Sequence, residues 1–122
     1  FPVARSSAGA IRAALERATG KRLGVVITDS AGRPWRTGTQ GLALGISGPP
    51  AYRDLRGGED LFGRRLEATM PAIADAIAAA AVLLMGETTE APPVCVLRGL
   101  DWTPSAQTGA DTQRAMQEDL FR

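Results

Sequence analysis

The stretch that decides the fold is residues 23–46, which read LGVVITDSAGRPWRTGTQGLALGI. Residues 23–28 are a short apolar run rich in β-branched side chains, which predicts a buried strand. Residues 29–34 are turn formers, because Asp and Ser bond local amides, Gly permits positive φ and Pro restricts φ. Residues 41–46 alternate small and large side chains and predict a second strand, whose glycines allow close approach by a ligand or another chain. We therefore expect two strands joined by a turn, with the return starting at residues 35–36.

An amphipathic helix is predicted ahead of this stretch, at residues 6–19. Ser6 or Ser7 can cap its start, and Gly20 is a natural end. The segment that follows the second strand, residues 47–65, is rich in glycine and proline and predicts a long loop. A loop of this length is usually functional or packs against a partner.

A second, alanine-rich helix is predicted from a cap at Thr69 to Met85, with Gly86 as its end. Its only charged residue is Asp75, so we expect most of its faces to be buried. An unpaired buried carboxylate is costly, and we expect Asp75 to have a structural partner such as an arginine. The apolar run of this predicted helix is too short to cross a bilayer of about 30 Å.

The end of the chain adds two more expected elements. Residues 94–97 predict a third strand, which Arg98 follows, and residues 111–121 predict a final helix. The order is then α-β-β-α-β-α. This order favours an α+β fold with a mixed or antiparallel sheet and a long, buried, alanine-rich helix.

Composition narrows the class of protein. The 122 residues suit one domain, and 14 Lys and Arg against 13 Asp and Glu provide no general attraction to nucleic acid. The single cysteine excludes an internal disulfide framework. Histidine is absent, which excludes Ser-His and Cys-His dyads and histidine-containing zinc sites. Any chemistry therefore falls to carboxylates, hydroxyls, arginines, glycines or a bound metal.

The densest group of reactive residue types follows the first expected strand. Asp29 and Ser30 offer oxygen ligands for a hard cation such as Mg²⁺ or Mn²⁺. Arg33 and Arg36 follow at once and suit a phosphate or a substrate carboxylate, which makes them the candidate catalytic residues. The alternative is a capped hairpin turn with solvated arginines, and spacing alone favours this alternative.

Three other residues each allow two interpretations. Glu87 after the long helix is either a further metal ligand or part of an ordinary polar helix exit. Arg98 either meets an oxyanion or forms an intramolecular salt bridge. Cys95 lies among valines, and such a cysteine is most often a small core residue.

Taken together, several segments resemble one known family. Residues 25–38 resemble its pattern V-I-x-[ST]-D-[ST]-x-G-R-x-W-R-x-G. Further matches follow in order along nearly the whole chain, at residues 43–45, 60–66, 74–87, 97–100 and 118–121. The chain is therefore similar to the coenzyme F-420-0:L-glutamate ligases, also called gamma-glutamyl ligases.

The resemblance implies a GTP-dependent ligase. The family uses GTP to phosphorylate the terminal carboxylate of a deazaflavin phospholactate, and L-glutamate attacks the acyl phosphate to give an amide, GDP and phosphate. A divalent metal, Mg²⁺ or Mn²⁺, is required, and potassium often helps. Metal catalysis suits a chain without histidine, because metal ions neutralise and align phosphates.

Position by position, the resemblance assigns roles to two short segments. It implies that Asp29 and Ser30 bind the metal at the nucleotide phosphates. It also implies that Gly86 and Glu87 contact the nucleotide and that Glu87 is a further metal ligand.

The resemblance further implies that residues 1–122 are the C-terminal portion of a larger ligase domain. We therefore expect the isolated chain to be inactive without the N-terminal half. The expected parent is a cytoplasmic homodimer that acts on the deazaflavin and L-glutamate, with no nucleic-acid or membrane partner.

One departure from the family pattern leaves an alternative open. The family continues R-x-G-Q-x-D before A-[IV]-G, whereas residues 36–41 read RTGTQG, so that the Gln is displaced by one and the Asp is absent. A non-catalytic homologous module, which dimerises or binds a phosphorylated ligand, would tolerate this change. Without the resemblance, the residues support only an α+β domain with an arginine-rich surface and no site.

Overall fold

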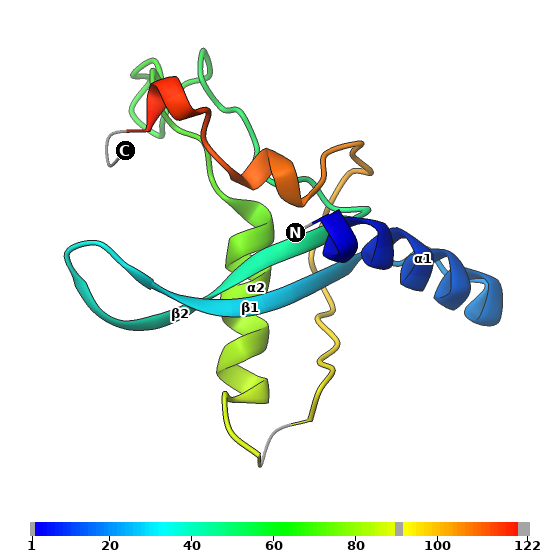
Figure 1. The fold of residues 1–122 in the computed structure, drawn as a ribbon. Helices are drawn as coiled ribbons and strands as arrows, with labels where there is room; N and C mark the ends of the chain where they lie inside the picture. Colours follow the sequence, from blue (N-terminus) through cyan, green and yellow to red (C-terminus); the bar gives the residue numbers. More distant parts are fainter. Residues whose placement is uncertain (1, 90–91, 120–122) are drawn as a thin grey trace.

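The computed structural model describes residues 2–89 and 92–119 (Figure 1). The elements are, in chain order, α1 (Pro2–Thr19), β1 (Val25–Arg33), β2 (Arg36–Ser47), α2 (Ile73–Met85) and the short 3₁₀ helices η1 (Gly109–Thr112) and η2 (Met116–Glu118). β1 and β2 form a two-stranded antiparallel ribbon. The predicted α+β class with an antiparallel sheet is therefore confirmed.

The ribbon is longer than the sequence suggests, and its turn is shorter. Residues 29–33 continue β1, so the expected turn at 29–34 is wrong. The chain reverses through Pro34 and Trp35 alone, and Trp35 has a φ of 63°. Two residues suffice for a hairpin because proline restricts φ at the first corner position and the next residue takes the positive φ that the turn requires.

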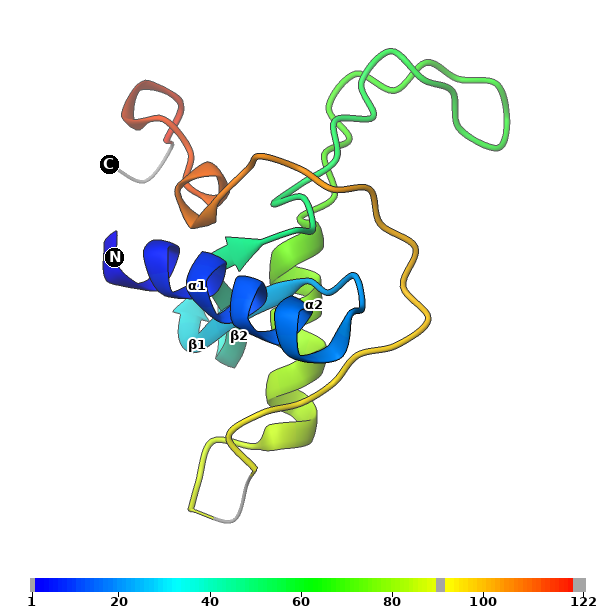
Figure 2. The ribbon, with the colours of Figure 1, turned by 90° about the vertical axis from the view of Figure 1, so that its right-hand side faces the viewer.

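The two long helices pack on opposite faces of this ribbon (Figures 1 and 2). A Cβ added to Gly41 would lie 2.5 Å from the carbonyl oxygen of Ala78 in α2, whereas one added to Gly45 would clash with the carbonyl of Ala4 in α1. In a regular strand, residues 41 and 45 would share a face. The pairing slips at Leu44, which is an extra residue in β2, and this slip turns Gly45 to the other face.

The core between these layers is small. Among the described residues, the hydrophobic side chains buried in the core are those of Ile46 in β2 and of five alanines. Leu83 and Leu84, in the last turn of α2, are 85% and 68% exposed, so the expectation that most faces of this helix are buried is wrong at that end. Figure 1 shows the reason, because α2 crosses the ribbon and extends beyond it, where no other helix or strand of the described residues covers it.

Both long helices begin at positions other than those expected. The expected cap at Ser6 or Ser7 is wrong, because α1 already includes Pro2 and the Ser6 hydroxyl donates to the carbonyl of Val3 within the helix. The predicted end at Gly20 is confirmed by its φ of 66°.

The start of α2 is at Ile73, and the expected cap at Thr69 is wrong. The carbonyl of Thr69 accepts a hydrogen bond from the Leu55 amide at 3.1 Å, and that of Pro71 accepts one from the Arg53 amide at 3.0 Å. These bonds hold residues 69–71 in an extended conformation beside the preceding loop, so the helix starts only after the proline.

Two expected elements near the C-terminus are wrong. Residues 94–97 form no strand, and Val94 and Val96 are 72% and 71% exposed. A strand needs a neighbour, and no backbone group of this segment is hydrogen-bonded within the described residues. The helix expected at 111–121 is replaced by η1 and η2 as far as residue 119, while residues 120 and 121 lie outside the described residues. The Thr108 capping box supports a single short turn, because Gln113 is already extended.

The loop after β2 carries an ion pair that perturbs a pKa. The Arg56 side chain donates to the Asp54 carboxylate at 2.8 and 2.6 Å, and the Arg56 backbone amide donates to it at 3.1 Å. The side-chain hydrogen bonds from Arg56 contribute most to lowering the pKa of Asp54 from 3.8 to about 2, and the backbone hydrogen bond from Arg56 contributes next. A carboxylate whose pKa is lowered by folding stabilises the folded state at pH values above its pKa in the unfolded chain. For Asp54 this contribution is lost as the pH falls from 3.8 to about 2.

We therefore expect Arg56→Gln to raise the pKa of Asp54 toward 3.8, because it removes the charged donors. The measurement is the midpoint of the Asp54 carboxyl ¹³C shift during an NMR titration. Arg53→Gln is the control, since Arg53 donates to the Asp101 carbonyl and not to Asp54. An unchanged midpoint in Arg56→Gln would show that the pair does not hold in solution.

Candidate functional site

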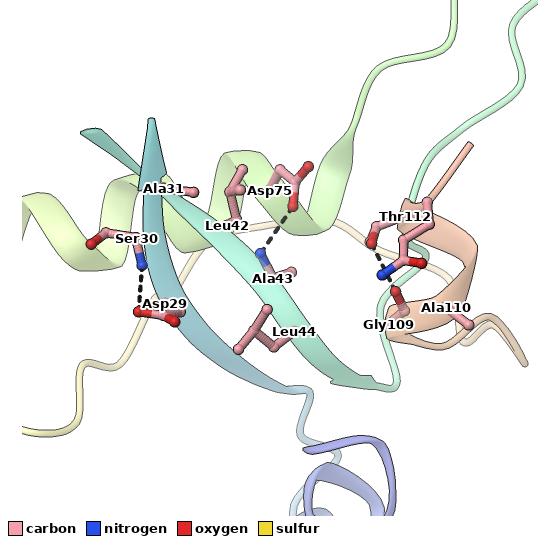
Figure 3. Close-up of a pocket in the computed structure, with 11 residues that line it drawn as sticks. Asp29, Ser30, Ala31, Leu42, Ala43, Leu44, Asp75, Gly109, Ala110 and Thr112 are labelled. Atoms are coloured by element: carbon pink, nitrogen blue, oxygen red, sulfur yellow. Dashed lines mark hydrogen bonds between the residues drawn. The ribbon is translucent and has the colours of Figure 1, made fainter. Parts of the chain in front are cut away.

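Two cavities meet at the middle of β1. The first has a volume of about 460 Å³ and lies between the ribbon, the first turn of α2 and η1 (Figure 3). Its wall is apolar at Leu42 and Leu44 and polar at Asp75 and Thr112. Asp29 and Ser30 complete the lining on the β1 side.

The second cavity has a volume of about 380 Å³ and lies between β1, the end of α2 and the loop after α2. Asp29 and Ser30 line it from β1, and Gly86 and Glu87 line it from the far side. The fold therefore brings together the two short segments to which the resemblance assigns metal and nucleotide binding.

Asp29 and Ser30 belong to both cavities because of their place in the ribbon. Successive residues of a strand point to opposite faces, and Figure 3 shows these two side chains leaving β1 in different directions. β1 pairs only with β2 in the described part of the chain, so its outer edge is open and groups from both faces can meet a ligand there. One oxygen of the Asp29 carboxylate accepts a hydrogen bond from the Ser30 amide at 2.8 Å, and this bond orients the carboxylate.

Glu87 is placed by the end of α2. Gly86 ends the helix with a φ of 71°, and its amide donates to the Val82 carbonyl at 2.8 Å, which confirms the predicted end. The Thr39 hydroxyl in β2 donates to the Glu87 carboxylate, with its two oxygens at 3.1 and 3.3 Å.

The two candidate catalytic arginines lie elsewhere. Arg33 and Arg36 face each other across the hairpin turn, and neither lines either cavity. Arg33 donates to the Gln40 side chain, and its buried Nε has no hydrogen-bond partner within the described residues. Contact between these arginines and a phosphate or carboxylate therefore stays a prediction.

Asp75 lines the first cavity, and its hydrogen-bond partner is of a different kind from the one expected from the sequence. Its carboxylate accepts a hydrogen bond from the backbone amide of Ala43 at 2.9 Å, so the expected structural partner is confirmed but is a backbone amide and not an arginine (Figure 3). The bond ties the first turn of α2 to the middle of β2, and Asp75 also lines the first cavity. No local sequence pattern indicates this contact, because it joins residues that are 32 positions apart.

We expect Asp75→Ala to lower the free energy of unfolding by about 1–3 kcal/mol, because it leaves the buried Ala43 amide without an acceptor. Asp75→Asn keeps an acceptor oxygen and should lose clearly less. Urea denaturation of the two variants measures the difference. Equal losses would show that the hydrogen bond is not what Asp75 contributes.

The oxygen donors around the second cavity suit a hard cation. Mg²⁺ is usually held by one or two carboxylates, with waters and substrate phosphates as the other ligands. In residues 2–89 and 92–119, no group of three or more His, Cys, Asp or Glu side chains could hold a metal by itself. Asp29, Ser30 and Glu87 supply oxygen donors of the kind that such an ion takes, and metal binding by them stays a prediction.

The remaining sequence candidates lie outside both cavities. Arg98 is exposed, and neither of the salt bridges found in the described residues includes it. Cys95 is a free, half-buried thiol. Within the described ranges, no helix has both the length and the apolar character needed to cross a membrane.

Fold and cavities together define an α+β protein in which carboxylate and hydroxyl oxygens line two cavities beside β1. The chain belongs to the F420-0:gamma-glutamyl ligase family, whose profile matches residues 2–99. The family expected from the sequence motifs is thus confirmed.

Proteins named coenzyme F420:L-glutamate ligase are similar over almost the whole chain. That of Methanocaldococcus jannaschii is 47% identical over 116 residues, which are 95% of this chain and 47% of the relative. The Archaeoglobus fulgidus protein is 45% identical over 116 residues, 95% of this chain and 46% of the relative. The Methanopyrus kandleri protein is 41% identical over 120 residues, 95% of this chain and 48% of the relative. The chain thus spans about half the length of the curated relatives it matches.

Proposed function

We propose that this chain is part of a GTP-dependent ligase that adds L-glutamate to coenzyme F-420-0. The observation that carries the proposal is the second cavity, because residues 29–30 and 86–87 are far apart in the sequence and line it together. Family membership supports the choice of reaction, since the similar proteins are named coenzyme F420:L-glutamate ligase. As in the sequence analysis, residues 1–122 would be the C-terminal portion of the ligase.

In the proposed reaction, the terminal carboxylate of F-420-0 attacks the γ-phosphorus of GTP and GDP leaves. The amine of L-glutamate then attacks the acyl carbon, an amide bond forms and phosphate leaves. A Mg²⁺ or Mn²⁺ ion would neutralise and align the phosphates when bound. Asp29, Ser30 and Glu87 would hold that ion, and Gly86 would contact the nucleotide without a side chain in the way.

The exposed apolar surface supports the proposal that the rest of the ligase packs against this chain. Large apolar side chains normally lie in a core or an interface. Here they are exposed at the end of α2 and in the unpaired segment 94–97. The relatives have as much sequence again outside the matched region. We therefore propose that the 122-residue chain alone is inactive, and homodimer formation, potassium dependence and cytoplasmic location stay predictions.

A non-catalytic module remains the second candidate, and the segment 39–41 favours it. Thr39 and Gln40 stand where the family pattern has its Gln and the next residue, and Gly41 stands where it has an Asp. If the missing Asp were essential, the fold would persist without turnover, and the protein would dimerise or hold a phosphorylated ligand.

Turnover separates the two candidates. The assay measures phosphate release from GTP by the longest natural form of the protein that contains this sequence, with Mn²⁺, L-glutamate and F-420-0. We expect release that depends on both F-420-0 and the metal, together with a glutamylated product by mass spectrometry. Metal-dependent GTP binding without product would instead support the non-catalytic module.

A further inference from the structure

The hydroxyl of Thr39 connects two parts of the molecule that the sequence separates. Thr39 lies in β2, and Glu87 lies in the loop after α2. The Thr39 Oγ1 atom is 3.1 Å from Glu87 Oε2 and 3.3 Å from Glu87 Oε1, so one hydroxyl is shared by both oxygens of the carboxylate. No other hydrogen bond to this carboxylate is found in the described part of the chain.

Glu87 needs such a contact if its carboxylate is to stay in one place. Its side chain is exposed and loses conformational entropy whenever it is held in a single rotamer. A donor shared by both oxygens restricts the last torsion as well as the direction of the side chain. Outer hydrogen bonds of this kind orient carboxylates that bind metals, and their loss costs about 10–100-fold in metal affinity.

We infer that Thr39 is the positioning residue for Glu87 and holds its carboxylate at the cavity that Asp29 and Ser30 line. This inference rests on the proposed function, because it takes Glu87 as a metal ligand. Thr39 stands where the family pattern has a Gln. At this position, the inferred role of the Thr39 hydroxyl in this chain is to orient the Glu87 carboxylate.

The test measures Mn²⁺ binding to the longest natural form of the protein that contains this sequence by NMR, from the paramagnetic broadening of the Ser30 and Glu87 amide signals. Thr39→Val removes the hydroxyl and keeps the shape of the side chain. We expect it to weaken Mn²⁺ binding about tenfold. Thr39→Ser keeps the hydroxyl and should restore the affinity to within about twofold of the unchanged chain.

Thr37→Val is the matched control, because Thr37 lies on the same strand, is exposed and makes no side-chain hydrogen bond among the described residues. It should leave the affinity unchanged. In a Glu87→Gln background, Thr39→Val should add little further loss, because a positioning residue has no effect once its carboxylate is gone.

The possible outcomes separate a failure of this inference from a failure of the proposed function. Normal Mn²⁺ affinity in Thr39→Val, with a clear loss in Glu87→Gln, would overturn the role of Thr39 and leave the metal site in place. Absence of broadening at Ser30 and Glu87 in the unchanged chain, or full affinity in Glu87→Gln, would overturn both. Equal losses from Thr39→Val and Thr39→Ser would also overturn the inference, since the hydroxyl would not be the relevant group.

Discussion

Replacing Asp29 with alanine should lower the metal-dependent affinity for GTP by about 100-fold or more. The carboxylate is exposed in β1 and lines the second cavity, so it can neutralise a cation that bridges to the phosphates. Its removal should leave the fold intact, because the ribbon is held by backbone pairing and, among the described residues, the Asp29 carboxylate accepts only the amide of the next residue. The measurement is a titration with a fluorescent GTP analogue, with and without Mn²⁺, on the longest natural form of the protein.

A matched control for this variant is Asp101→Ala, which removes an exposed carboxylate that lines neither cavity. It should leave the affinity within about twofold, since surface charges separated from the site are screened by salt. The two variants together separate a ligand role from a change in net charge. Unchanged metal-dependent affinity in Asp29→Ala would remove Asp29 from the site.

Gly41→Ala should lower the free energy of unfolding by about 2–3 kcal/mol. The new Cβ would lie 2.5 Å from the carbonyl oxygen of Ala78 and 2.8 Å from Val82 Cγ2, so α2 would have to move away from the ribbon. α2 supplies Ala74 and Ala78 to the small core, and such a shift would open it. Denaturant unfolding followed by circular dichroism measures the loss.

Gly32→Ala is the matched control, because Gly32 lies in the partner strand and a Cβ there meets nothing within 4 Å. Its effect on the unfolding free energy should stay within about 0.5 kcal/mol. A Gly41→Ala variant as stable as Gly32→Ala would show that α2 does not pack against β2 as closely as described.

The packing at Gly41 also explains one departure from the family pattern. The sequence shows only that the expected Asp is absent from this position. In the folded chain, position 41 is buried and faces the backbone of α2, which leaves no room for a carboxylate. The glycine therefore permits close helix packing here.

Local chemistry was enough to predict some of the elements. Residues 23–28 and 41–46 are apolar runs of strand type, and both lie within or beside the observed strands. Gly20 and Gly86 end the long helices because only glycine adopts positive φ without strain. The motifs identified the family because their order and spacing can be read directly from the sequence.

The elements that failed were those whose state depends on a neighbour. Residues 94–97 have strand composition, but a strand forms only beside another strand. Thr69 is a suitable cap residue, but its carbonyl pairs with Leu55 and holds the segment extended. Residues 111–119 carry helix formers, but most of them are exposed and no adjacent layer among the described residues buries them.

The sequence by itself determined the α+β class, the family and the residue types available for chemistry, because these follow from composition, periodicity and motif order. Only the tertiary structure decided which of these residues meet. The open edge of β1 and the end of α2 place residues 29–30 and 86–87 around one cavity, while the hairpin carries Arg33 and Arg36 away from it. One extra residue at Leu44 shifts the register of β2 next to Ala43, whose backbone amide donates to Asp75. Such contacts between distant segments depend on the path of the backbone, which local residue preferences do not specify.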